Sequence, residues 1–184
     1  MKPIVEVANA SHHTFAVAIC DMMATASKVR GTGIAKRNPA YICEKMTEGK
    51  AIIALYDNQV VGFCYIESWE NKKYVANSGL IVHPDFRKSG LARAIKNATF
   101  QLSRKQFPNA KLFGITTSAA VMKINSALGY RPVSFAELTN DESFWKGCQS
   151  CVNYDILQRT QRKMCLCTAM LCELNSYNKT TNHD

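Results

Sequence analysis

Apolar residues recur at strand-like and helix-like spacings along most of the chain, and turn residues separate the segments. The expected strands are residues 4–7, 51–55, 60–66, 75–82, 111–116 and 130–133. The expected helices are residues 11–31, residues 38–49, a long helix that begins near residue 90, and residues 117–129. Strands alternating with helices in this way predict an α/β fold: a mixed sheet with helices on its faces.

Several boundaries carry their own chemical signal. Asn38-Pro39 places an N-cap residue before a proline at the first helical position. Ser11 is the candidate N-cap of the first helix. Asp57-Asn58 between two apolar runs predicts a hairpin turn. Gly129 is expected to end the helix that precedes it.

The C-terminal part differs in character from the rest. Residues 151–157 and 164–171 are expected to form strands, whereas residues 175–184 are polar and expected to be a disordered tail. We therefore expect a main domain over residues 1–140 and a cysteine-rich β extension over residues 141–174, packed on that same domain.

Composition narrows the function classes. The chain has 184 residues, of which 47% are hydrophobic, as expected for one globular domain. No run of about 18 apolar residues predicts a membrane span, and the N-terminus does not resemble a signal peptide, so we expect a cytoplasmic protein. The net charge of +9 favours anionic partners, but the basic residues are spread along the chain, which disfavours nucleic acid.

The most informative segment joins the strand at residues 79–82 to the helix that begins near residue 90. It contains Arg87, Lys88, Ser89, Gly90, Leu91 and Ala92. A helix N-terminus offers unpaired backbone N–H groups and partial positive charge, and glycine lets a ligand approach the backbone closely. The loop lacks the Gly-Lys-Ser/Thr ending of a phosphate-binding P-loop and the three glycines of a dinucleotide fingerprint.

Two motifs at the expected separation give the chain a family resemblance. Val82-His83-Pro84 precedes Arg87-Lys88-Ser89-Gly90-Leu91-Ala92, and a later helix ends in Leu128-Gly129-Tyr130. Over about residues 1–135 the sequence resembles the GNAT superfamily of N-acetyltransferases. The resemblance implies the GNAT fold and acetyl-CoA as cofactor, with its pyrophosphate held by residues 87–92. It also implies that its pantetheine arm contacts the backbone of Leu80, Ile81 and Val82.

One position departs from the family pattern. Many members have a tyrosine where this chain has Asn125, and that tyrosine is described as the acid that protonates the departing thiolate. An amide cannot deliver a proton, but it can hydrogen-bond the sulfur or the pantetheine arm. An alternative to an enzyme is therefore an acyl-CoA-sensing module with weak catalysis.

The candidate base and acceptor site rest on residue type and position. Glu67, at the end of an apolar strand, is the leading candidate for the base that takes the amine proton, with His83 second. Residues 28–37 form a basic segment in which Arg30 and Arg37 are expected to bind acceptor carboxylates.

The expected acceptor is thus the amine of a small acidic metabolite. The whole chain also resembles acetyltransferases found beside arginine-biosynthesis genes in Bacteroidetes-type bacteria, which suggests glutamate or a related amino acid. The expected partners are acetyl-CoA and this small molecule, and a homodimer is left open.

Five of the eight cysteines fall between residues 148 and 172. Two close pairs could supply a tetrahedral thiolate site for structural zinc: Cys148, Cys151, Cys165 and Cys167. The competing interpretation is that these cysteines pack as small apolar side chains in core strands.

Overall fold

The computed structural model describes residues 2–30 and 37–173, which form two compact units. Unit 1 comprises residues 1–67 and 77–102, and unit 2 comprises residues 68–76 and 103–184. Seven strands form one mixed sheet in the order β1-β2-β3-β4-β5-β7-β6. This arrangement confirms the mixed α/β class. Within the described residues, no helix is both long enough and apolar enough to cross a membrane.

Unit 1 begins with an antiparallel meander. Strand β1 (Ile4–Val7) pairs with β2 (Ala51–Tyr56), and β2 pairs with β3 (Gln59–Trp69). The turn between β2 and β3 has positive φ at Asp57 (48°) and Asn58 (55°), as a two-residue hairpin with the twist of its strands requires. The predicted hairpin is therefore confirmed.

Three helices pack in unit 1: α1 (Ala16–Arg30), α2 (Pro39–Thr47) and the part of α3 (Leu91–Gln106) up to residue 102. The Asn38 side chain accepts the N–H of Tyr41 at 2.8 Å, which confirms the predicted cap of α2. The first helical segment is different from the prediction. It starts as a 3₁₀ turn at residues 10–15, and its cap is Asn9 rather than Ser11, whose N–H bonds to Asn9 Oδ1.

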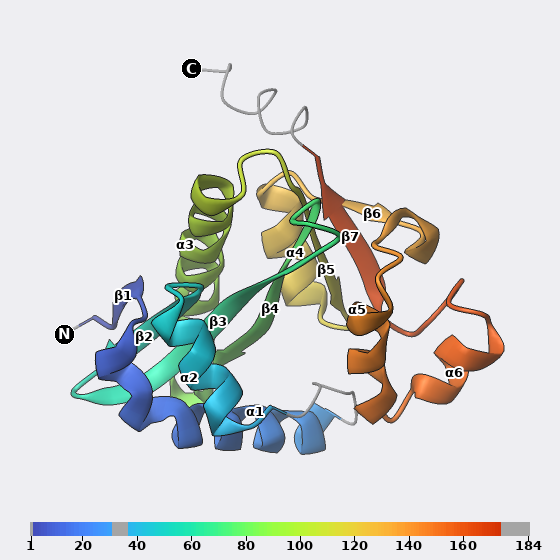
Figure 1. Cartoon of the computed structure of the whole chain (residues 1–184). Coiled ribbons are helices and arrows are strands. Elements are labelled where there is room, and N and C mark those ends of the chain that lie inside the picture. The colour runs from blue at the N-terminus through green and yellow to red at the C-terminus, as the bar shows by residue number, and fades with distance from the viewer. Residues whose placement is uncertain (1, 31–36, 174–184) are drawn as a thin grey trace. The chain divides into compact units, whose positions relative to one another are not determined.

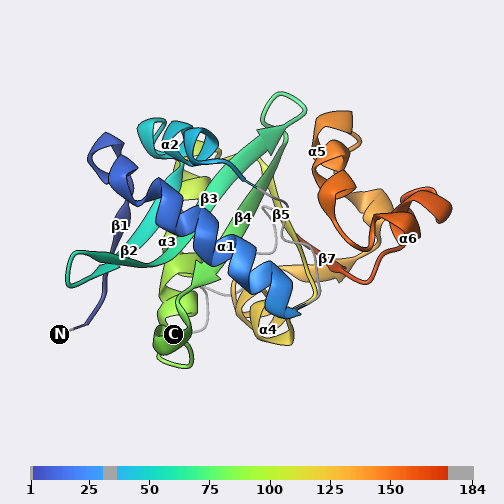
Figure 2. The ribbon, with the colours of Figure 1, turned by 90° about the horizontal axis from the view of Figure 1, so that it is seen from below.

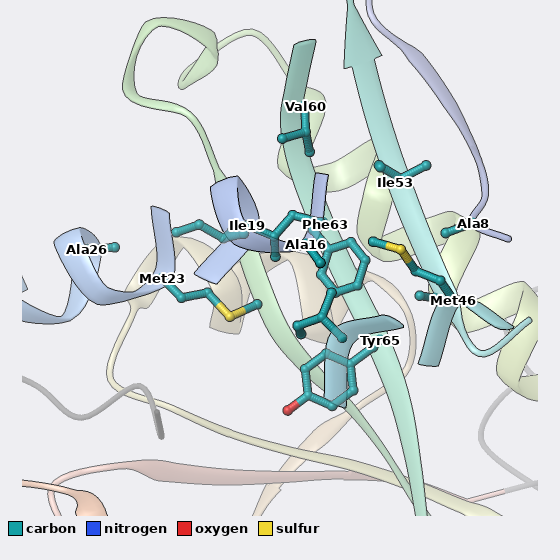
Figure 3. Close-up of a cluster of buried hydrophobic side chains, with 13 residues drawn as sticks. Ala8, Ala16, Ile19, Met23, Ala26, Met46, Ile53, Val60, Phe63 and Tyr65 are labelled. Atoms are coloured by element: carbon teal, nitrogen blue, oxygen red, sulfur yellow. The ribbon is translucent and has the colours of Figure 1, made fainter. Parts of the chain in front are cut away.

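Separate apolar cores lie on the two faces of the unit 1 strands. Helices α1 and α2 cover one face and α3 covers the other (Figure 2). The first core contains large buried side chains from both helices and from β3, and in Figure 3 the hydroxyl of Tyr65 lies at its edge, pointing away from Phe63. Ile95 of α3 belongs to the second core. The adjacent strands therefore carry buried side chains on both faces.

Strand β4 (Tyr74–Val82) has one backbone irregularity in its second half. Gly79 has φ +65°, a left-handed conformation in the middle of a strand. A Cβ at this position would lie 2.5 Å from Cε1 of Tyr65 and 2.9 Å from Cε of Met23. Both the backbone conformation and the close approach of these side chains require glycine here. The irregularity comes directly before residues 80–82.

Unit 2 contains the other strands of the sheet. Strand β4 pairs in parallel with β5 (Lys111–Thr116) through residues 74–76. Strand β7 (Thr168–Cys172) runs antiparallel between β5 and β6 (Arg131–Val133), as Figure 1 shows. Helix α4 (Ala119–Ala127) follows β5, and the Ser118 hydroxyl caps it by accepting the N–H of Val121.

The prediction of strands at residues 151–157 and 164–171 was wrong for most of their length. The segment after β6 forms the short helices α5 (Glu142–Lys146) and α6 (Tyr154–Arg159), and only residues 168–172 form a strand. A helix lets Leu157 of α6 pack beside Trp145 in the unit 2 core, while Val152 is 72% exposed. The apolar residues of this segment thus follow neither a two-residue alternation nor a fully buried run.

Candidate active site

The predicted cofactor loop is held by short-range contacts at the end of β4. His83 Nδ1 accepts the N–H of Asp85 at 3.4 Å and so caps the 3₁₀ turn at residues 84–86. The guanidinium of Arg87 donates from Nε to the carbonyl of Val82 at 3.3 Å. The Ser89 hydroxyl donates to the carbonyl of Phe86 at 2.6 Å. The polar side chains of the loop therefore hydrogen-bond to the backbone of the same segment and hold its conformation.

Gly90 is the residue from which α3 begins. Its carbonyl accepts the N–H of Ala94 at 3.1 Å, so the amides of Leu91, Ala92 and Arg93 lie in the first turn, where no intrahelical acceptor exists. Gly90 has φ +87°, and a Cβ built on it would meet no atom within 4 Å. Unpaired amides in the first turn of a helix, with free space beside them, can bind the oxygens of a pyrophosphate.

The charge of the loop suits the same ligand. Lys88 and Arg87 are exposed, and Lys88 has φ +62°, so two left-handed residues turn the loop around its amides. The residues present at 87–92 therefore fit the anionic part of an acyl-CoA.

The side chains of residues 80–82 pack in the two apolar cores of unit 1. Leu80 and Val82 pack with the α3 core, and Ile81 packs with the α1 core. The contact of the pantetheine arm with the backbone of this segment stays a prediction.

Glu67, the candidate base, lies in a dense polar cluster in unit 1. Its Oε2 accepts a hydrogen bond from the Tyr41 hydroxyl, and the Lys45 ammonium lies 3.3–3.4 Å from its two oxygens. The Glu67 side chain is 23% exposed, whereas that of Lys45 is 5% exposed. The carboxylate is therefore reachable from solvent and is held in place from the protein side.

The protonation states of this cluster follow from its surroundings. Burial, together with the neighbouring Tyr65 and Glu67, raises the pKa of Tyr41, so Tyr41 is a neutral donor. Burial alone would lower the pKa of Lys45, but the carboxylates of Glu67 and Glu48 outweigh it and raise the pKa above its usual value. Lys45 is thus a buried cation with acidic partners.

Arg37, the candidate acceptor-binding residue, belongs to the same cluster. Its Nε donates to the Tyr65 hydroxyl at 2.6 Å, and its guanidinium carbon lies 5.4 Å from the centroid of the Tyr41 ring. Tyr41 therefore touches both Arg37 and Glu67. The structure brings together the predicted carboxylate-binding residue and the predicted base, through a tyrosine that the sequence analysis did not single out.

Arg30 is the last residue of α1, and its side chain is not among those described. Residues 31–36 lie outside the described residues. His83 is 41% exposed, caps the turn after β4 and lies 3.7 Å from the carboxylate of Asp85.

Asn125, the candidate thiolate or pantetheine contact, lies in helix α4 of unit 2 and is 1% exposed. Its Nδ2 lies 3.6 Å from the sulfur of Met170, a weak acceptor, and its buried Oδ1 has no hydrogen-bond partner within the described part of the chain. A buried amide oxygen without a donor is costly, and a bound ligand that carries an N–H group could satisfy it.

The four candidate zinc ligands are neighbours in unit 2. Burial, followed by the nearby Cys165, Cys151 and Cys148, raises the pKa of Cys167 to about 12, so its thiol is neutral. Across residues 2–30 and 37–173, no group of three or more histidine, cysteine, aspartate or glutamate side chains is placed to hold a metal ion. The zinc interpretation therefore gains no support, and Cys165 and Cys167 precede β7 rather than lie on a strand.

Part of the sequence that contains these residues is similar to a known protein family. Residues 37–120 match the sequence model of the "Acetyltransferase (GNAT) family". The match includes Arg37, Glu67 and the whole loop 87–92, and ends before Asn125. The similarity to this family therefore lies in the central part of the chain, and the chain has the GNAT fold. No curated protein matches it.

Solved structures agree on the fold at low sequence identity. N-acetylglutamate synthase from Neisseria gonorrhoeae, complexed with coenzyme A and N-acetyl-glutamate, is 13% identical with a TM-score of 0.66; the match covers 95% of this chain and 35% of the Neisseria chain. This chain therefore spans about a third of that enzyme. Rv2747 from Mycobacterium tuberculosis, complexed with CoA and NLQ, is 18% identical with a TM-score of 0.65, over 94% of this chain and 99% of that one. A phosphinothricin acetyltransferase from Sinorhizobium meliloti with acetyl-CoA is 14% identical with a TM-score of 0.62, over 95% and 89%.

Proposed function

We propose that this protein is an acetyltransferase that transfers the acetyl group of acetyl-CoA to the amine of a small acidic metabolite, glutamate or a related amino acid. The observation that carries the proposal is the shared cluster of Arg37 and Glu67. An α-amino acid bears a carboxylate and an ammonium group on one carbon. A guanidinium and a carboxylate that contact the same tyrosine, Tyr41, offer one partner for each.

The roles of the residues follow from their chemistry. Arg37 binds the acceptor carboxylate, with its guanidinium oriented by the Tyr65 hydroxyl. Glu67 takes the amine proton, directly or through the Tyr41 hydroxyl, which can accept one proton while donating its own. The deprotonated amine attacks the thioester carbonyl, and the CoA thiolate leaves.

Each unit carries its own candidate cofactor contacts. The first-turn amides of α3 and the cations of residues 87–88 bind the pyrophosphate. In unit 2, the Asn125 oxygen, which has no hydrogen-bond partner among the described residues, accepts an N–H of the pantetheine arm. In the alternative orientation, with the amide oxygen and nitrogen exchanged, the Asn125 amide donates to the CoA sulfur instead.

Comparison adds support for the acceptor class. Among the similar structures, the Neisseria enzyme is named for N-acetylglutamate and was solved with that molecule. The net charge of +9 also favours an anionic acceptor. The resemblance to acetyltransferases beside arginine-biosynthesis genes points the same way and is part of the proposal.

The test is an acceptor screen followed by one matched pair of variants. Among amino acids and neutral amines, acidic amino acids should give the highest kcat/KM. Arg37→Ala should then raise the acceptor KM by about tenfold or more, since a charge-assisted hydrogen bond is lost, and leave the KM for acetyl-CoA nearly unchanged. The exposed Arg159→Ala should change neither constant. A neutral amine as the best acceptor would refute the acidic-acceptor proposal.

A further inference from the structure

Helix α3 carries a buried polar stripe beside its apolar one. Lys96, Thr99 and Ser103 are 2%, 0% and 0% exposed, and their spacing of three and four residues places them on one side of the helix. Lysine is almost never fully buried unless it has polar partners, because its charged form loses hydration. These three buried side chains therefore need polar partners inside the protein.

These partners lie in the part of β4 next to Gly79. The Lys96 ammonium donates to the carbonyl of Asn77 at 3.4 Å. On the next residue, the carbonyl of Ser78 accepts from the thiol of Cys64 in β3 at 3.3 Å. Thr99 lies beside the Cys64 side chain and donates its hydroxyl to the carbonyl of Ile95 at 2.8 Å. Two successive β4 carbonyls thus bond to side chains of α3 and β3.

These two carbonyls come directly before Gly79, the left-handed residue of β4. On that side of the sheet Lys96 and Cys64 hold the backbone, while on the α1 side Tyr65 and Met23 approach so closely that only glycine fits. The conformation of residues 77–79 is therefore fixed from both faces. Residues 80–82, whose backbone is the expected contact of the acyl-CoA arm, begin immediately after it.

We propose that Lys96, assisted by Cys64, is a positioning residue for acetyl transfer: it holds the Asn77–Gly79 backbone so that residues 80–82 present their backbone groups to the acyl-CoA arm. This rests on the proposed role of residues 80–82, but not on the identity of the acceptor. Lys96 does not touch the reacting atoms. Burial lowers the pKa of Lys96, and the nearby Cys64 opposes this effect; both the ammonium and the neutral amine can donate to a carbonyl.

The test separates alignment from cofactor binding. Lys96→Met keeps the length and the apolar stem of the side chain and removes the donor. We expect kcat to fall by about tenfold or more, as loss of one hydrogen bond from a charged donor implies. The Kd for CoA by calorimetry should change by less than about threefold, because the pyrophosphate loop keeps its own contacts. Lys105→Met, on the exposed side of the same helix, is the control and should leave both constants unchanged.

A second pair covers the case in which Lys96→Met does not fold. Cys64→Ala removes the donor to Ser78, and Cys64→Ser keeps one; kcat should fall in the first and recover in the second. Amide hydrogen exchange of residues 77–82 in the acetyl-CoA complex should be faster in the impaired variants than in the parent. A kcat within about twofold of the parent in folded Lys96→Met, or equal rates for the two Cys64 variants, would overturn the proposal. The assay uses whichever amine turns over fastest, so a neutral acceptor would refute the proposed function and leave this test intact.

Discussion

The clearest test of the cofactor loop is a charge placed at Gly90. Because a Cβ there meets no atom within 4 Å, a side chain at this position would extend into open space and not into the protein. The remaining cost is backbone strain at φ +87°, which is about 1–2 kcal/mol for an ordinary L-residue and smaller for asparagine or aspartate. Gly90→Asp should therefore fold and still place a carboxylate where the pyrophosphate is expected.

The electrostatic penalty can be bounded. Two unit charges about 5 Å apart at an effective dielectric constant of about 20 repel by about 3 kcal/mol, and solvent and salt at this exposed loop reduce that to about 1.5 kcal/mol. Gly90→Asp should therefore weaken CoA binding by at least about tenfold.

Gly90→Asn is the matched control, since it has the same shape and the same backbone preference without the charge. Calorimetric titration of CoA into both variants and the parent, at low and high salt, measures the difference. Aspartate should bind more weakly than asparagine, and the gap should narrow as salt rises. Equal affinities for the two variants at low salt would remove Gly90 from the pyrophosphate site and refute the reasoning.

Two further predictions concern unit 2. Asn125→Ala should lower kcat by roughly five- to a hundredfold, the value of one buried hydrogen bond at about 1–3 kcal/mol; complete loss of turnover with CoA affinity and fold intact would contradict this. The Thr139 hydroxyl and the Asn140 N–H donate to Glu70 at 2.7 and 2.8 Å and lower its pKa. Their stabilisation is present above the unfolded pKa, about 4.3, and is lost as pH falls through the folded value, so Glu70→Gln should reduce the urea midpoint at pH 7 and have little effect near pH 3.

Local chemistry made much of the fold predictable. The Asn38-Pro39 start of α2 and the Asp57-Asn58 hairpin each depend on contacts within a few residues, and each is present in the structure. The C-terminal region offered no comparable signal. Its apolar residues suited a strand or a helix equally, and in the structure residues 154–159 are helical, with Leu157 in the same buried cluster as Trp145.

The same distinction explains which site residues the sequence could reveal. The cofactor loop closes on itself: Arg87 bonds to a carbonyl five residues away, and Ser89 bonds to one three residues away. The cluster proposed to bind the acceptor joins Arg37 to Tyr65 across 28 residues and Tyr41 to Glu67 across 26. A sequence motif can specify a site such as the loop, because the contacts that give it its geometry join residues close together in the sequence.

The cluster of Arg37, Tyr41 and Glu67, in contrast, forms only when α2 packs against β3. Lys45 illustrates the consequence. In the sequence it is one more lysine on a predicted helix, and a solvent-exposed position is the usual expectation for that residue type. In the structure its side chain is 5% exposed, and its ammonium lies among three carboxylates, Glu44, Glu48 and Glu67. Ile42 and Met46 have the four-residue spacing of one helix face, and Lys45, three residues after Ile42, lies on the same buried face of α2. A charged residue next to a predicted core stripe is thus the signal that could have located this cluster, as Lys96 beside Ile95 could have located the polar stripe of α3.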